Sequence, residues 1–333
     1  MIEKTRLVKK QAKQGLDNLE FELALTGKDM KDLQKQPLIN AKGFTYGSVE
    51  AKNGKAIILI NLPRFVCGNN IMPYSIFESI SLDMIRNDCI EQLGRIFNNC
   101  LNTQVNKIEV NITQQVSGNA TVNDVLNLLC HATLSSEFDN VKYVGKNKQD
   151  LESFKEESHS VITRKPHYWV CKCYNKSEQI TKERIKYNLP IDDIPQDLLR
   201  IEFVLVERTL KKLFKDKRTL SDVLLAKNIV EIFREYKRIF WNEIIKKSIK
   251  PYLKYCTQKL FETMIEMGSP IEAIAREREL IPDARVLQRA LKKYMEWKGV
   301  TNNSARDTRR YVEKFDLPVD CLMTITAFKK SCG

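Results

Sequence analysis

The sequence contains few of the features that define several large protein classes. Only 12 of its 333 residues are Gly and 10 are Pro, which excludes a collagen-like or low-complexity chain. It has no apolar run of about 18 residues, so no membrane-spanning helix is predicted. The N-terminus lacks the apolar centre of a secretory signal, and the 9 Cys are odd in number and scattered, which is typical of reduced thiols. We therefore expect a soluble, cytoplasmic, globular protein without a membrane partner.

Histidine is also scarce, and the three residues, His131, His159 and His167, form no metal-binding pair. His131 lies in an apolar helical pattern and is interpreted as a core residue, whereas His167 is the better candidate for a site because it precedes a predicted strand. Cys171 and Cys173 have no second pair at zinc spacing, so no zinc site is predicted. A metal site in this chain would depend on carboxylates.

The charge that is present is strongly basic. The chain has 55 Lys and Arg against 42 Asp and Glu, a net charge of +13, and residues 211–260 hold 14 against 5, a local net of +9. Such an excess favours a polyanionic partner, usually nucleic acid, although a charge run is also compatible with a solvated helix face. The candidate phosphate contacts are Arg200, Lys211, Lys212, Lys215, Lys217, Arg218, Arg306, Arg309 and Arg310.

Hydrophobic periodicity predicts an α+β fold, with an antiparallel sheet and flanking helices followed by an all-helical C-terminal region. A hairpin is predicted around Asn53-Gly54, whose residues accept the positive φ angles of a tight turn. Helices are predicted over residues 76–101 and 123–134, the second with Asn123 as its N-cap. Further strands are predicted over residues 105–112, 141–144, 161–163, 167–174 and 198–206.

The residues after 207 have only helical patterns, with a basic amphipathic region over 211–260 and helices over 270–281, 284–298 and 304–315. The first forty residues allow one helix or strand. We divide the chain into an N-terminal segment (1–42) packed on the next unit, a catalytic domain (43–215) and a basic helical DNA-binding domain (216–333).

Three short segments place chemistry-bearing side chains on predicted strands. Glu109 lies on the polar face of one strand and Glu202 on another, and two such carboxylates could hold a hard divalent cation. Tyr174 ends a third strand, where it could attack a phosphate if the cation or Lys176 favours the phenolate. A shared site requires the Tyr174 hydroxyl to lie within about 10 Å of one of these carboxylates.

A simpler interpretation of the same residues remains open. Glu109 and Glu202 could pair with Lys107 and Arg200 on a solvated face, and Tyr174 could be an ordinary strand residue. Tyr143, Tyr168 and Tyr187 are further candidate nucleophiles.

Four ordered motifs carry a family resemblance that spans residues 43–215. They are Leu62-Pro63-Arg64-Phe65-Val66-Cys67-Gly68-Asn69-Asn70, Lys107-Ile108-Glu109-Val110, Cys173-Tyr174-Asn175-Lys176 and Leu198-Leu199-Arg200-Ile201-Glu202. In this order they resemble the replication initiators of the filamentous-phage gene II/X type, and the last two also resemble the initiators of staphylococcal rolling-circle plasmids. The chain departs from the family pattern after the tyrosine, where the acid is Glu178 and the usual acidic position is Gln179.

The resemblance implies a relaxase-like enzyme that nicks and rejoins origin DNA to start rolling-circle replication. It implies that Tyr174 attacks the DNA and remains linked to the 5′-phosphate, that Glu109 and Glu202 hold Mg²⁺ or Mn²⁺, and that Lys176 stabilises charge on the phosphate or the phenolate. The partners it implies are origin DNA, single-stranded or supercoiled, and a host helicase and polymerase. Phage or plasmid origin and oligomeric state stay open.

Two rival functions remain. One is a non-enzymatic origin-binding regulator of the same fold, which would bind DNA without forming a covalent adduct. The other is a metal-dependent hydrolytic nuclease, whose cleavage would survive Tyr174→Phe but not Glu202→Gln.

Overall fold

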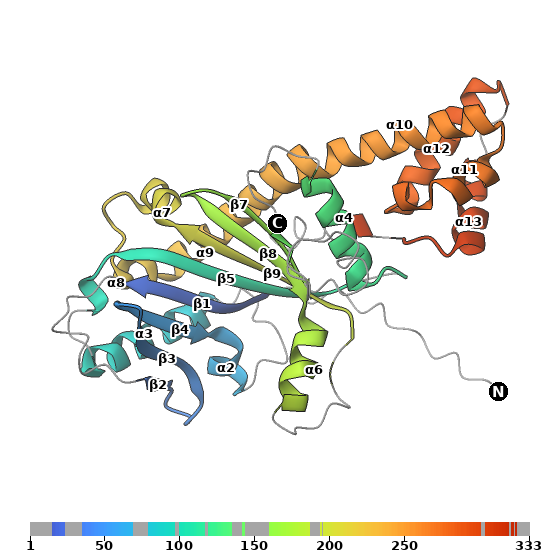
Figure 1. The fold of residues 1–333 in the computed structure, drawn as a ribbon. Coiled ribbons are helices and arrows are strands. Elements are labelled where there is room, and N and C mark those ends of the chain that lie inside the picture. Colours follow the sequence, from blue (N-terminus) through green and yellow to red (C-terminus); the bar gives the residue numbers. More distant parts are fainter. Residues whose placement is uncertain are drawn as a thin grey trace, which may run out of the picture.

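The computed structural model describes most of the chain and shows an α+β protein built on one antiparallel sheet (Figure 1). The described residues are 15–23, 35–68, 79–96, 100–116, 119–134, 142–143, 160–186, 194, 196–300, 304–319, 321–322 and 324. Their nine strands are ordered β2-β3-β4-β1-β5-β9-β8-β7-β6. The strands are β1 (Gly15–Leu23), β2 (Gln36–Ile39), β3 (Thr45–Lys52), β4 (Lys55–Asn61), β5 (Val105–Gln115), β6 (Lys142–Tyr143), β7 (Ser160–Lys165), β8 (Trp169–Asn175) and β9 (Leu198–Val206).

The predicted hairpin is confirmed. β3 and β4 pair antiparallel from Gly47 opposite Ile60 to Lys52 opposite Lys55. Asn53 and Gly54 connect them with φ angles of 52° and 73°, the left-handed backbone that a tight hairpin turn requires.

The N-terminal segment contributes β1, which pairs with β4 on one side and with β5 on the other. Its alternate residues Leu19, Phe21 and Leu23 are buried, as the two-residue period of a strand requires. The sequence did not decide between a helix and a strand for this segment, and the structure shows that β1 is a central strand of the sheet.

Helices cover one face of the sheet. α9 (Ala226–Ile239) and the π-helical segment η2 (Phe240–Ile249) pack there, and the ring of Phe203 on β9 lies 4.8 Å from that of Tyr236 and 6.4 Å from that of Phe240. Burying such aromatic rings makes this face the hydrophobic core. The opposite face carries the polar residues of the central strands.

The C-terminal region is helical, as predicted. α9, η2 and α10 (Lys250–Met267) follow one another without an intervening turn, and α10 contacts α11 and α12 in a lobe that projects from the sheet (Figure 1). Pro251 lies just after the π-helical segment η2 and has no N–H to donate to the carbonyl of Lys247, as an α-helix would require. The other helices are α2 (Leu62–Cys67), α3 (Ser79–Ile96), η1 (Cys100–Asn102), α4 (Val122–Leu134), α6 (Lys176–Lys186), α7 (Glu207–Phe214), α8 (Leu220–Val223), α11 (Pro270–Arg276), η3 (Arg278–Leu280), α12 (Ala284–Trp297) and α13 (Ser304–Phe315).

One predicted helix start is wrong. The N–H of Asp124 donates to the hydroxyl of Thr121 at 3.2 Å, so Thr121 and not Asn123 caps α4.

The division of the chain at residue 216 stays a prediction, although helices from the later part pack on the sheet. No helix in the described ranges is long and apolar enough to span a membrane.

Candidate active site

The register of three neighbouring strands brings the predicted site residues together on the polar face. Tyr174 on β8 lies opposite Arg200 on β9, and Lys172 lies opposite Glu202. Because residues two apart on a strand share a face, Tyr174, Lys172, Arg200 and Glu202 all project from the same side. Glu109 is on the adjacent strand β5, two residues before the direct partner of Glu202.

The Tyr174 hydroxyl donates to Glu202 Oε1 at 2.5 Å. Tyr174 is half-buried and Glu202 is 9% exposed. Burial, and then the negative charge of Glu202, raise the pKa of Tyr174 above its ordinary value, while Arg200 opposes the rise. The phenol is therefore protonated at neutral pH, with a carboxylate placed to receive its proton.

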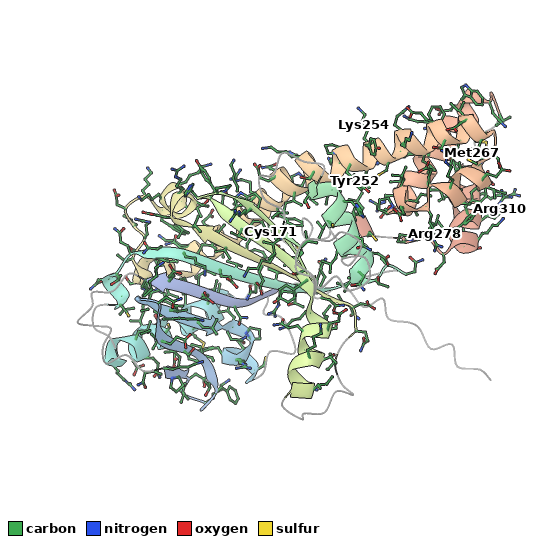
Figure 2. All side chains as sticks on the ribbon, in the orientation of Figure 1. Cys171, Tyr252, Lys254, Met267, Arg278 and Arg310 are labelled. Atoms are coloured by element: carbon green, nitrogen blue, oxygen red, sulfur yellow. The ribbon has the colours of Figure 1, made fainter. Side chains whose placement is uncertain are left out.

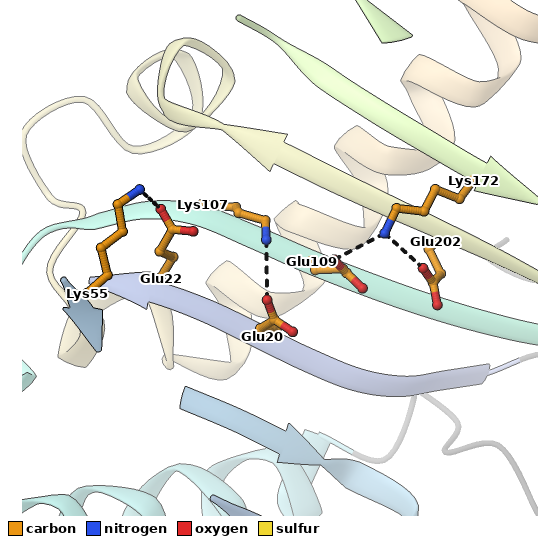
Figure 3. A network of polar contacts seen from close by, with 7 residues as sticks. All are labelled: Glu20, Glu22, Lys55, Lys107, Glu109, Lys172 and Glu202. Carbon is orange, nitrogen blue, oxygen red and sulfur yellow. Dashed lines mark hydrogen bonds and ion pairs between the residues drawn. The ribbon is translucent and has the colours of Figure 1, made fainter. Parts of the chain in front are cut away.

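The ammonium of Lys172 lies between the two glutamates, 3.4 Å from Glu202 and 3.9 Å from Glu109 (Figure 3). Burial, together with the charge of Glu202, raises the pKa of Glu109, and Lys172 acts in the opposite direction. For Lys172 itself burial lowers the pKa, but the two carboxylates outweigh it and the net shift is upward. Lys172 thus neutralises part of the charge that the two glutamates would otherwise share.

Lys107 pairs with a different carboxylate from the one that the simpler interpretation gives it. Lys107 lies 3.3 Å from Glu20 on β1, whereas Glu109 lies beside Lys172 (Figure 3). The Nε of Arg200 donates to Thr113 Oγ1 at 3.0 Å. Further along β1, on the same face of the sheet, Glu22 pairs with Lys55 of β4.

The donor set around Glu109 and Glu202 fits a hard divalent cation in its chemistry. Asn111, directly opposite Glu202, is 7% exposed, and its Oδ1 accepts no hydrogen bond within the described part of the chain. Two carboxylates and an amide oxygen are ligands that Mg²⁺ and Mn²⁺ accept. No group of three or more His, Cys, Asp or Glu suited to a metal occurs among the described residues, and Lys172 already contacts both carboxylates. A cation would have to displace that ammonium.

Lys176 begins α6 directly after β8 and is 9% exposed. Its Nζ donates to Gln179 Oε1 at 3.0 Å. Glu178 accepts from the Asn175 side chain at 3.0 Å while its own N–H donates to Asn175 Oδ1 at 3.2 Å. This reciprocal arrangement caps α6 and gives Glu178 a structural role.

The basic residues after β9 lie away from Tyr174. Arg200 is near the start of β9 and Val206 at its end, six residues and about 20 Å further along the strand. The exposed residues Lys211, Lys212, Lys215 and Lys217 all follow that far end.

Arg218, by contrast, is 6% exposed. It donates to Gln104 Oε1 at 2.7 Å and lies 3.7 Å from Glu207. These contacts tie the chain after α7 to the start of β5, so we leave Arg218 out of the DNA-binding surface.

Arg306, Arg309 and Arg310 are exposed on α13. Figure 2 shows Arg310 in the projecting lobe. Arg310 lies 3.6 Å from Asp307 and over the ring of Tyr311. The structure therefore keeps this second basic cluster apart from the residues around Tyr174.

The histidine and tyrosine alternatives are not at this site where the structure describes them. His167 and Tyr168 are in the turn between β7 and β8, at the opposite end of β8 from Tyr174, so His167 does not belong to the site. His131 stacks on Tyr252 with ring centroids 6.3 Å apart, as a packing residue does. Tyr187 and the side chain of Tyr143 lie outside the described residues.

The sequence interpretation missed Lys172 and Asn111. Each lies two residues from a chosen residue, Lys172 before Tyr174 and Asn111 after Glu109. The two-residue period of a strand would have placed both on the same face. What it could not supply was which strands are neighbours.

No protein-family model matches the chain, and no curated protein matches it significantly.

Proposed function

We propose that this protein is a replication initiator that nicks and rejoins origin DNA through Tyr174. The observation that carries the proposal is the contact between the Tyr174 hydroxyl and Glu202, on a polar strand face with Arg200 beside them. A buried phenol is a poor nucleophile until its proton is removed, and a carboxylate at hydrogen-bond distance can remove it.

In this reaction the phenol oxygen of Tyr174 bonds to phosphorus as its proton passes to Glu202. The bond from phosphorus to the 3′ oxygen breaks, and the departing 3′ oxygen takes up one proton. One phosphodiester is exchanged for another, so the step needs no external energy source and can run backwards to rejoin the strand. Arg200, the cross-strand partner of Tyr174, would stabilise negative charge that develops on the phosphate.

The cofactor belongs to the same proposal. Glu109, Glu202 and Asn111 would hold Mg²⁺ or Mn²⁺ once Lys172 moves aside. When bound, such a cation neutralises charge on a phosphate oxygen. Lys172, which is 36% exposed, has space on its solvent side to move.

The proposed protein partners, a host polymerase and a host helicase, follow from the nicked DNA that the reaction would produce. A free 3′ hydroxyl is a primer for a polymerase, and strand displacement from a nick calls for a helicase. The exposed Lys and Arg residues of α7 and α13 are proposed to position origin DNA through its phosphates without reading bases.

The test uses the full chain with Mg²⁺ or Mn²⁺ and single-stranded fragments tiled across the DNA that flanks its gene. We expect a covalent adduct that survives denaturing electrophoresis. Tyr174→Phe should abolish it, whereas Tyr168→Phe, at the other end of β8, should retain it and serves as the matched control.

Three results would overturn the proposal. Binding without any adduct indicates the origin-binding regulator. Cleavage that persists in Tyr174→Phe but is lost in Glu202→Gln indicates the hydrolytic nuclease. An adduct still formed by Tyr174→Phe shows that another residue is the nucleophile.

A further inference from the structure

A cavity of about 540 Å³ lies on the polar side of the sheet, and Arg200, the cross-strand partner of Tyr174, is one of the residues that line it. Residues of β2, β3 and the end of β4 line it on one side, and the first half of β1, the start of β9, the first residue of α6 and Arg64 of α2 complete the lining. Its volume is within the range of about 300–1,000 Å³ that is typical of sites for small ligands.

The charged residues that line this cavity are all cations, namely Lys35, Arg64, Lys176 and Arg200. No Asp or Glu is among its lining residues in the described ranges. Lys35 is exposed and lies 3.8 Å from Glu50, a separation at which an exposed pair contributes little. Lys176 and Arg200 are 9% and 6% exposed, so two of the cations are held within the protein.

The wall of the cavity is preorganised. Asn61 donates to Asn18 Oδ1 at 2.6 Å, and its own Oδ1 accepts the N–H of Arg64 at 2.8 Å. The first bond joins β4 to β1, and the second starts α2, so the backbone of Arg64 is fixed relative to the sheet.

The polar face therefore has two electrostatically different halves. Glu20, Glu22, Glu109 and Glu202 occupy one half, where lysines pair with them (Figure 3). The cationic cavity occupies the other half. Tyr174 lies at the boundary, because its hydroxyl contacts Glu202 and its cross-strand partner Arg200 lines the cavity.

We propose that this cavity binds the phosphodiester backbone of single-stranded DNA next to the phosphate that Tyr174 attacks. The inference rests on the proposed function and adds the path of the strand. A polyanion is attracted to the cavity more strongly than to the other half, where Lys55, Lys107 and Lys172 nearly balance the four glutamates, so the strand reaches Tyr174 from the cavity side. An extended single strand can bring a phosphate to the buried Arg200 and Lys176, whereas the backbone of a duplex is held at its surface.

The experiment measures binding without cleavage, using the full chain with Tyr174→Phe and fluorescently labelled oligo(dT). Fluorescence anisotropy gives the Kd over a range of NaCl concentrations. The double change Arg64→Ala and Lys35→Ala should raise the Kd about tenfold and reduce the salt slope by about 1.4, since each phosphate contact with a single strand contributes about 0.7.

The matched control is Lys254→Ala with Lys259→Ala, which removes the same charge from exposed positions on α10. Its Kd should stay within about twofold, because general attraction falls off over a Debye length. Ser48→Ile places a bulkier, uncharged side chain in the cavity without an aromatic ring on which bases could stack, and it should also raise the Kd about tenfold. Circular dichroism and Tm establish that each variant is folded.

An unchanged Kd in both cavity variants overturns the inference, as does an equal loss in the α10 control, which would indicate diffuse attraction. Competition with dTMP separates a polynucleotide site from a mononucleotide site, and equal affinity for dTMP also overturns it. The adduct assay is independent of this one. Cavity-dependent binding without an adduct contradicts the proposed function alone, and an adduct with cavity-independent binding contradicts this inference alone.

Discussion

Glu202 uses its two carboxylate oxygens for different partners. Oε1 accepts the Tyr174 hydroxyl at 2.5 Å, and Oε2 lies 3.4 Å from the ammonium of Lys172. One carboxylate thus connects the proposed nucleophile to the ion pairs of the polar face. A change of charge at Lys172 will therefore be felt at the Tyr174 hydroxyl through this shared carboxylate.

Replacing Glu202 by Gln should slow nicking by at least about 10²- to 10⁴-fold, because the amide can still contact Tyr174 but cannot take its proton and is a weaker ligand for the proposed cation. The single-turnover rate of adduct formation measures the effect, and the Kd for DNA should stay unchanged. Glu22→Gln is the control, since Glu22 pairs with Lys55 further along the same face. A rate within about tenfold of wild type would contradict the role of Glu202 as general base.

Removal of the Lys172 ammonium should favour a divalent cation at Glu109 and Glu202. Without its competing positive charge, Lys172→Ala should bind Mn²⁺ about tenfold more tightly than wild type. The increase of Tm with Mn²⁺ concentration measures this affinity without reference to activity. Lys107→Ala is the control because Lys107 pairs with Glu20. Equal Mn²⁺ responses in wild type and Lys172→Ala would argue against a cation at this position.

The raised pKa of Glu109 predicts how stability depends on pH. Burial, followed by the charge of Glu202, favours the protonated carboxyl in the folded state. Its stabilising contribution is complete below the unfolded pKa of about 4.5 and is lost as the pH rises through the higher folded pKa. Wild type should therefore lose stability relative to Glu109→Gln as the pH rises from 4.5 towards neutral. Urea unfolding of both proteins over this interval measures the difference, and a flat or opposite trend would be inconsistent with it.

Arg218 is expected to affect folding and not DNA binding. Arg218→Ala leaves Gln104 without its partner and should lower the free energy of unfolding by about 1–3 kcal/mol. Lys217→Ala, at an exposed neighbour, should change it by no more than about 0.5 kcal/mol. Urea unfolding measures both. If Arg218→Ala weakens oligo(dT) binding at unchanged stability, Arg218 is a DNA contact after all.

Local patterns in the sequence predicted much of the sheet. Asn53-Gly54 predicted the hairpin, and the strand predicted over residues 198–206 coincides with β9. Both predictions depend only on residues that are close together in the sequence: the turn residues in the first case and the run of strand-forming residues in the second. The strand β1 was left undecided because its apolar residues are mixed with charged ones, and its two strand partners, rather than local preference, determine its structure.

The geometry of the candidate site depends on pairing between distant segments. Two-residue periodicity puts Glu109, Tyr174 and Glu202 each on a face of its own strand, but it does not state that β9 lies between β5 and β8. The position of Lys172 between two carboxylates follows only from that order. The cavity was equally inaccessible to sequence reasoning, since Lys35, Arg64, Lys176 and Arg200 come from four separate segments.

The uninterrupted run of helix from α9 through η2 to α10 sets how the lobe is held relative to the sheet. An α-helix advances about 1.5 Å and turns about 100° per residue. A residue inserted into or removed from α10 between the sheet and the lobe would therefore act to shift the lobe by that amount and to rotate it by more than a quarter turn. Hydrogen bonds that join Gln114 and Asn119 to the chain that follows α13 would resist this movement, so helix length and these bonds together set which way α13 and its arginines face.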